Sequence, residues 1–244
     1  MSFKRAKNIS EVKQKLKGSF LLSNPFEWTT KQQGVLDILN DKNTKCMFLN
    51  GPAGVGKTQL AIYSGLQHLQ VNLYSKIIYI RSIVESSHQS TGYLPGTLED
   101  KLSPFMEILE DKLSDIINET DILNLKKEGR IESRCISHLR GKDFKKTFII
   151  VDEAQNITFE ELKTIISRVG ENCKIIFLFD PKQSDLKKDF RKNDIVKFSN
   201  IFKNNKSINF GIFYKEFVKS DIMRSDFCKF VMEEIDSYIE RHQE

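Results

Sequence analysis

Several residue types that would define a class of protein are scarce in this chain. Among its 244 residues are only four cysteines, Cys46, Cys135, Cys173 and Cys228, and no two of them form a Cys-x-x-Cys pair. The sequence therefore supports neither a disulfide framework nor a zinc site built from cysteine pairs. The four histidines are also scattered, with no His-x-x-x-His pair, so they indicate no metal site either.

Long hydrophobic runs are also lacking. No run approaches the roughly 18–20 apolar residues that a membrane-spanning helix needs, and the first residues, "MSFKRAKNIS", contain no apolar signal-peptide core. We therefore expect a cytoplasmic protein with no membrane partner. The hydrophobic fraction of 39% and the charged fraction of 29% are typical of a folded globular protein, and the length suits one sizeable domain.

The net charge of +5 is mild, but the basic residues are concentrated in two stretches. Residues 1–20 carry six Lys and Arg against one acid, and residues 186–206 carry seven against two. Such stretches can form an electrostatic footprint for nucleic acid, or they can be solvated loops in a chain rich in Lys and Asn. Both interpretations stay open. The same residue usage suggests an AT-rich bacterial or phage genome.

Short apolar, β-branched runs alternate with helical patterns along the chain. Near-continuous apolar character is typical of strands that are buried on both faces of a parallel sheet. The alternation predicts an α/β domain, a parallel sheet flanked by helices with right-handed crossovers. The four clear runs are residues 45–50, 75–82, 146–153 and 173–180, and a weaker fifth is 207–214.

The predicted organisation is a basic N-terminal segment, residues 1–27, followed by one domain, residues 28–244. The interval 83–145 is too long for a single crossover connection. It begins with a loop containing glycine and proline, and then shows apolar residues at helical spacing from Leu98 to Ile116. We therefore expect a helical insertion over about 83–145, placed on the sheet of the same domain.

The most specific motif follows the first predicted strand. Residues 51–58, "GPAGVGKT", match the pattern G-x-x-x-x-G-K-[ST] and precede a helical pattern. Glycines at these positions let successive backbone N–H groups point at phosphates, and the next helix presents its positive N-terminus. Lys57 is expected to reach the β- and γ-phosphates, and Thr58 to bind Mg²⁺. The motif predicts a P-loop NTPase whose nucleotide contacts are Gly51, Pro52, Ala53, Gly54, Val55, Gly56, Lys57 and Thr58.

A second motif, "TFIIVDEAQNIT", places two acids where an apolar strand ends. Asp152 is expected on the strand next to the phosphate loop, where it can serve as a direct or indirect Mg²⁺ ligand. Glu153 can polarise an attacking water as a general base. A helix cap by Asp152 is the alternative, but it does not explain why both acids occur. The pair therefore favours hydrolysis over transfer to a metabolite.

Two glutamines complete the predicted site. Gln183 follows the strand run 173–180 and is a candidate γ-phosphate sensor, although Asp180 and Pro181 can also simply turn the chain. Gln32 lies three residues after Thr29, which satisfies a capping box before a helix. The same glutamine can also read the adenine edge, and the two roles do not exclude each other.

Together these pieces resemble the PhoH family of ATPases, which are related to the core domain of superfamily 1 helicases. The resemblance covers roughly residues 28–236. It rests on "GPAGVGKT", on "GYLPGTLEDKLSPFMEIL", on the long stretch from "HLRGKDF" through "VDEAQNITFEELKTIISRVG" to "FDPKQSDL", and on "FVKSDIMRSDFCKFVMEEI".

The resemblance implies a RecA-like sheet that binds ATP and Mg²⁺ at Lys57, Thr58 and Asp152. It makes Glu153 the catalytic acidic residue and Gln183 the sensor, and it adds Arg224 as an arginine finger. Whether Arg224 acts on the ATP of its own chain or of a neighbour stays open. Action on a neighbour would imply a homo-oligomeric ring.

Two hypotheses of different classes follow for the function. The first is an ATPase that couples hydrolysis to binding or remodelling single-stranded nucleic acid, with RNA favoured over DNA. The alternative is a nucleotide-gated module that self-assembles or docks onto a protein and hydrolyses ATP slowly. A small-molecule kinase is a third option, which the lack of an evident acceptor site disfavours.

Overall fold

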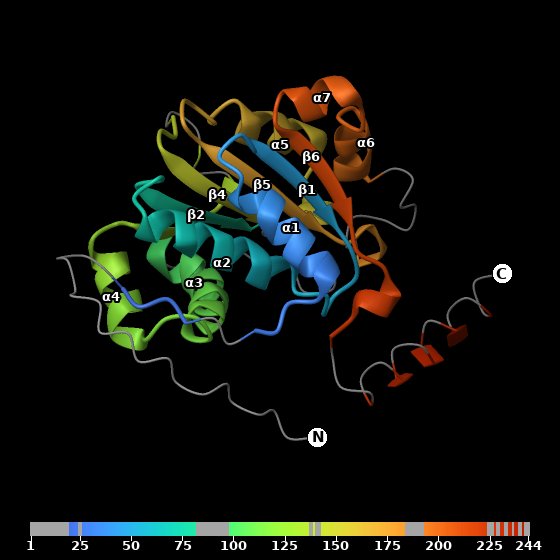
Figure 1. The fold of residues 1–244 in the computed structure, drawn as a ribbon, viewed down its shortest axis with the longest axis horizontal. Coiled ribbons are helices and arrows are strands. Elements are labelled where there is room, and N and C mark those ends of the chain that lie inside the picture. The colour runs from blue at the N-terminus through green and yellow to red at the C-terminus, as the bar shows by residue number, and fades with distance from the viewer. Residues whose placement is uncertain are drawn as a thin grey trace.

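The computed structural model describes residues 20–23, 26–81, 98–136, 139, 143–183 and 193–223, with the backbone alone at 98–105, and residues 227, 230, 231, 234, 235, 237, 238 and 241. Six strands form one sheet, in which every pairing is parallel (Figure 1). The order across the sheet is β3-β2-β4-β5-β1-β6. The strands are β1 Cys46–Asn50, β2 Lys76–Arg81, β3 Ile131–Arg134, β4 Thr147–Asp152, β5 Lys174–Phe179 and β6 Ile212–Glu216.

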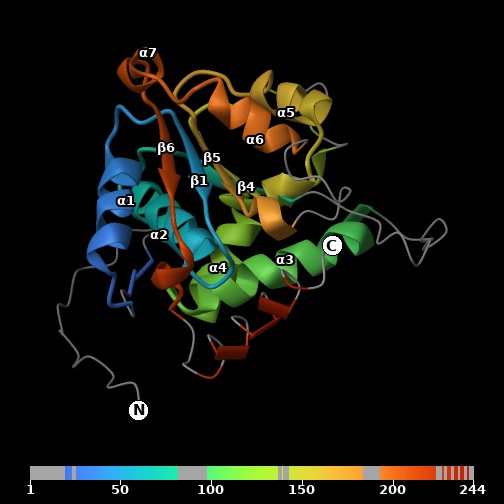
Figure 2. The ribbon, with the colours of Figure 1, turned by 90° about the vertical axis from the view of Figure 1, so that its right-hand side faces the viewer.

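Helices cover both faces of this sheet (Figure 2). The helices α1 Thr30–Asn40, α2 Lys57–Gln70, α3 Leu98–Ser114 and α4 Glu119–Lys127 share one hydrophobic core with the sheet. The helices α5 Phe159–Ile166 and α6 Asp194–Asn200 share the core of the other face. Because side chains alternate along a strand, Tyr79 and Ile150 belong to the first core, and Ile80 and Val151 to the second.

The four strong strand predictions are confirmed, and two details are wrong. The run 207–214 is not one strand: its first part lies in α7 Asn205–Asn209, and β6 begins at Ile212. Asn204 caps α7 through its side chain, and Gly211 takes a φ of 83°, which ends the helical path. The interval 83–145 is not purely helical, because β3 forms one edge of the sheet there.

The described end of the N-terminal segment packs against the domain. Phe20 is 3% exposed and belongs to the core of α1 and α2. The backbone N–H of Ser23 donates to the Ile116 carbonyl at 3.0 Å. Residues 20–23 therefore pack against the folded body, and the division of the chain at residue 28 stays a prediction.

No helix in the described part of the chain is both long and apolar enough to cross a membrane. Cys46, Cys135 and Cys173 are buried free thiols, as the sequence pattern predicts for at least Cys46 and Cys173.

Two glycine substitutions give a paired test of this fold. Gly211→Ala should lower the free energy of unfolding by at least about 2 kcal/mol, because alanine resists a φ of 83° and its Cβ would lie 2.1 Å from the Asn43 carbonyl oxygen. Gly34→Ala, on the exposed side of α1 with nothing within 4 Å, should raise it by about 0.5–1 kcal/mol. Urea denaturation measures both, and equal effects would contradict the structure around Gly211.

Candidate nucleotide-binding site

The phosphate loop, residues 51–56, joins β1 to the N-terminus of α2. Gly54 and Gly56 take φ values of 86° and 83°, in the left-handed region that glycine adopts readily. A Cβ at Gly51 would lie 2.7 Å from the Cβ of Phe217, so no side chain fits there. These glycines allow the loop to curl at the end of a 14-residue helix whose positive N-terminus favours anions.

Lys57 folds back over this loop. Its Nζ donates to the carbonyls of Gly51 at 2.6 Å and Pro52 at 3.0 Å. Burial lowers the pKa of the Lys57 ammonium, and three neighbouring carboxylates act in the opposite direction. These carboxylates belong to Asp180, Asp152 and Glu153.

Asp152 is held by three hydrogen bonds at the end of β4. Its Oδ2 accepts from the hydroxyls of Thr58 at 3.3 Å and Tyr79 at 2.5 Å. Its Oδ1 accepts from the Glu153 backbone N–H at 3.0 Å. Tyr79 is fully buried, and burial, followed by the Asp152 charge, raises the pKa of its phenol. The Tyr79 phenol therefore keeps its proton and is the donor in its hydrogen bond with Asp152.

The predicted position of Asp152 needs one correction. Its strand, β4, is not the neighbour of β1, because β5 lies between the two. The contact with Thr58 forms because α2 packs along one face of the sheet, in front of it in Figure 1, with its first turn at the end of β4. The sequence could not show which strands are neighbours, since a parallel sheet need not place its strands in chain order.

Glu153 turns sharply out of β4. Its φ of 52° is unusual for a residue other than glycine. The Oε2 atom accepts from Gln155 Nε2 at 2.5 Å, and Oε1 lies 3.5 Å from Arg81 Nη2. Gln155 is 2% exposed, and its Oε1 accepts from the Asp180 backbone N–H at 3.1 Å. One amide thus connects the tips of β4 and β5.

Asp180 and Gln183 follow β5. Asp180 is 7% exposed, and burial raises the pKa of its carboxyl against the opposing effects of the Lys182 N–H and of Lys57. The backbone N–H of Gln183 donates to the Asp180 carbonyl at 3.0 Å, and its side chain is exposed. The sensor role of Gln183 stays a prediction.

Gln32 carries out its predicted capping role. Its Oε1 accepts from the Thr29 N–H at 2.9 Å, and Thr29 Oγ1 accepts from the Gln32 N–H at 3.2 Å. Its Nε2 donates to the Val55 carbonyl at 2.9 Å, which connects α1 to the phosphate loop. Because the side chain is 1% exposed, only its remaining N–H and lone pair could meet an adenine, and that role stays a prediction.

The chain after β6 also contacts the loop. The Phe217 N–H donates to the Asn50 carbonyl at 2.8 Å, and the Met223 N–H to the Gly54 carbonyl at 3.0 Å. Asp221 pairs with Lys31 of α1 at 2.5 Å. Arg224, the predicted finger, lies outside the described residues, although the residue before it is tied to the phosphate loop.

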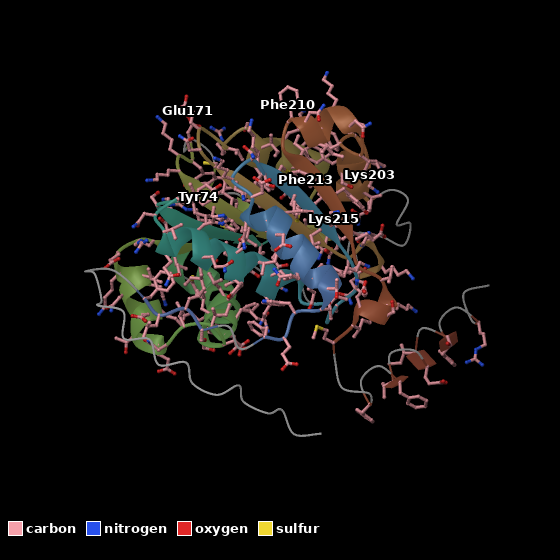
Figure 3. The ribbon with its side chains drawn as sticks, viewed as in Figure 1. Tyr74, Glu171, Lys203, Phe210, Phe213 and Lys215 are labelled. Carbon is pink, nitrogen blue, oxygen red and sulfur yellow. The ribbon has the colours of Figure 1, made fainter. Side chains whose placement is uncertain are left out.

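A separate pocket lies at the other end of the strands, where they begin. Its volume is about 770 Å³, and it contains none of the predicted site residues. Tyr74, Glu171 and Phe210, which line it, each precede a strand, as Figure 3 shows. Residues at this end of the strands are remote from the phosphate loop, so substitutions there are suitable controls.

The structure thus brings Lys57, Thr58, Asp152 and Glu153 together, with Gln32 beneath the loop. Sequence reasoning missed four further members of the site, whose signals were weak. Asp180 ends an apolar run in the same way as Asp152, which is a usable signal. The other three, Tyr79, Arg81 and Gln155, lie within or just after strands, where nothing local distinguishes them from packing residues.

Fold and site together define a P-loop protein of the NTPase type: a parallel sheet with the phosphate loop after one strand and paired acids after another. The sequence profile described as "PhoH-like protein" matches residues 27–236, and the chain belongs to the PhoH family. This confirms the resemblance seen in the sequence.

Individual relatives agree with this assignment. Protein PhoH2 of Bacillus subtilis (strain 168) is 38% identical over 161 residues, which are 64% of this chain and 36% of that protein. PhoH-like proteins of Mycobacterium leprae and of Synechocystis are 37% and 36% identical, over 65% and 67% of this chain. They are covered over 44% and 49% of their own length. The chain thus spans less than half of each of these relatives.

A solved structure, the Sulfolobus solfataricus SWI2/SNF2 ATPase core domain, is similar at 13% identity with a TM-score of 0.37. That similarity covers 83% of this chain and 47% of the other.

Proposed function

We propose that this protein is an Mg²⁺-dependent ATP hydrolase that couples hydrolysis to binding or remodelling single-stranded nucleic acid, with RNA favoured. The observation that supports this most directly is that Lys57, Thr58, Asp152 and Glu153 lie together near the carboxyl ends of the strands. A phosphate cradle beside a carboxylate aimed out of its strand suits attack by water rather than by a bulky acceptor.

The residues at the site fit Mg²⁺ and ATP. No group of three or more His, Cys, Asp or Glu side chains in the described parts of the chain could hold a metal by itself. Mg²⁺ in nucleotide sites is typically bound through one or two protein oxygens plus phosphates. Thr58 would supply the direct oxygen, and Asp152, which already accepts three hydrogen bonds, would act through the metal's waters.

Each protein group then has a distinct task. Lys57 would leave the loop carbonyls for the phosphates, where a charged donor stabilises developing negative charge. Glu153 would hold and deprotonate the attacking water. Gln183 would sense the γ-phosphate from the tip of β5. Arg224 would act as the finger, and its action on a neighbour would require a homo-oligomer such as a ring.

The nucleic-acid partner is supported by the two basic stretches and by membership of the PhoH family. Residues 1–19 of the first stretch and residues 186–192 of the second lie outside the described residues. Of the described lysines between 186 and 206, Lys197 lies 3.6 Å from Asp194, and the Nζ of Lys203 lies 3.6 Å from the centre of the Tyr214 ring. These two therefore already have partners on the protein.

The direct test is the steady-state ATPase rate of the chain alone, with single-stranded RNA and with single-stranded DNA. Stimulation by either would identify the nucleic acid on which the ATPase acts, and binding that weakens steeply with added salt would identify phosphate contacts. A rate indifferent to both would support the alternative, a nucleotide-gated assembly or docking module. Gel filtration with and without ATP would then follow that assembly.

The contact between Tyr79 and Asp152 gives a prediction about the metal. Tyr79→Phe removes a hydroxyl that donates to a charged acceptor and leaves no buried polar atom in its place. We expect the Mg²⁺ concentration for half-maximal ATPase activity to rise about three- to tenfold, because Asp152 loses one of its three restraints. Tyr63→Phe, on α2, is the control, and an unchanged Mg²⁺ requirement would contradict the role of Tyr79.

A further inference from the structure

The carboxylate of Glu153 has a partner on each oxygen. Gln155 Nε2 donates to Oε2 at 2.5 Å, and Arg81 Nη2 lies 3.5 Å from Oε1. A general base needs an oxygen that can accept a proton from the attacking water. In this arrangement both oxygens are engaged, and the arginine competes with the attacking water for Oε1.

The two partners differ in how firmly they are held. Gln155 is 2% exposed, and its other end accepts from the Asp180 N–H, so its contact with Glu153 is built into the fold. Arg81 is the last residue of β2, and its side chain is 25% exposed. A long, partly exposed ion pair of this kind shifts an equilibrium by only about two- to fivefold. The arginine is therefore the partner that can leave.

We propose that Arg81 is a positioning residue that restrains Glu153, and that a phosphodiester of a single-stranded nucleic acid releases this restraint by binding Arg81 at the tip of β2. The proposal rests on the proposed function, since it takes Glu153 as the base. It adds the site where the nucleic acid would act on hydrolysis.

The chemistry of the releasing ligand follows from the contact that it replaces. The ligand must be anionic, because it competes with a carboxylate for a guanidinium. A phosphate can accept two parallel N–H bonds from the planar guanidinium, which is stronger than the single long contact with Glu153. The backbone register puts Arg81 opposite Asp152. A nucleic-acid strand that bound Arg81 at the end of β2 would therefore lie beside the nucleotide site.

The γ-phosphate of ATP carries the same chemistry and is the other possible source. It is present in every turnover, so release by ATP alone would leave nothing for nucleic acid to stimulate through Arg81. Release by a nucleic acid predicts instead that stimulation depends on Arg81. The two sources are therefore separable by one variant.

The experiment compares wild type with Arg81→Gln in ATPase assays with and without a 20-nucleotide oligouridylate. We expect the basal rate of the variant to rise about two- to fivefold, its stimulation ratio to fall to about 1, and its affinity for ATP to stay unchanged. Arg81→Lys keeps the charge without the planar fork and should lie between the two. Thermal unfolding confirms that each variant is folded.

Arg134→Gln is the matched control. Arg134 ends the neighbouring edge strand β3 and pairs with Glu132, without contact with Glu153. Its basal rate and stimulation should equal those of wild type. In addition, the rise in basal ATPase rate that Arg81→Gln causes should vanish in the double variant that also carries Glu153→Gln.

A fall in the basal rate of folded Arg81→Gln would show that the arginine assists the chemistry and would overturn the restraint. A raised basal rate with full remaining stimulation would overturn the nucleic-acid ligand. If no nucleic acid stimulates the ATPase rate of the wild type, both the releasing ligand and the nucleic-acid partner of the proposed function are overturned. The basal rate of Arg81→Gln still decides the restraint in that case.

Discussion

Lys57→Ala is expected to weaken ATP binding by about 10²-fold or more. The lysine is the charged donor that the phosphate loop carries, and losing two charge-assisted hydrogen bonds to phosphate removes about 3 kcal/mol or more of binding free energy. Backbone N–H groups of the loop remain, so weak residual binding is compatible with this result. Isothermal titration with Mg²⁺ and ATP measures the change.

Lys146→Ala is a suitable control for this variant. Lys146 is exposed at the other end of the strands and lines the separate pocket there. It should bind ATP as wild type does. Wild-type affinity in Lys57→Ala itself would refute the assignment of the nucleotide site, provided that the variant unfolds at a temperature close to that of wild type.

Glu153→Gln is expected to keep ATP binding and to slow turnover by about 10²–10⁴-fold. The substitution preserves size, and its amide oxygen can still accept from Gln155, so the local hydrogen bonds need not change. The lost property is the ability to take a proton from water. Single-turnover hydrolysis, with binding measured separately, tests the two halves of this expectation.

Glu171→Gln, at the end of the strands remote from the loop, provides the comparison for this second variant. It changes the charge by the same amount and should hydrolyse ATP at the wild-type rate. If Glu153→Gln also did so, the base would have to be sought elsewhere, and Asp180, a buried carboxylate beside Lys57, would be the next candidate.

The parts of this protein that depend on local sequence were predictable. The strands β1, β2, β4 and β5 are apolar runs, the phosphate loop has a fixed spacing, and the Thr29 capping box involves residues only three apart. The β3 strand was not predictable, because its four residues "IESR" contain one apolar side chain and form an edge. Its strand conformation comes from pairing with β2.

The contacts that complete the site were also beyond sequence reasoning. Tyr79 reaches Asp152, and Gln155 reaches Asp180, only because the order of strands places β4 between β2 and β5. Strand order depends on the packing of the whole chain rather than on any window of it. Residues such as Arg81 therefore become site residues only when the sheet is assembled.

The bond from the Met223 N–H to the Gly54 carbonyl has a consequence for the synthesis of this protein. The phosphate loop is made early, but β1 lies between β5 and β6, and Phe217 and Met223 complete the surroundings of the loop. On a ribosome, the loop must wait for these late residues to emerge before it can take its final shape. Nascent chains that end before residue 217 should therefore bind no nucleotide, so that nucleotide binding reports that β6 and the residues after it have joined the fold.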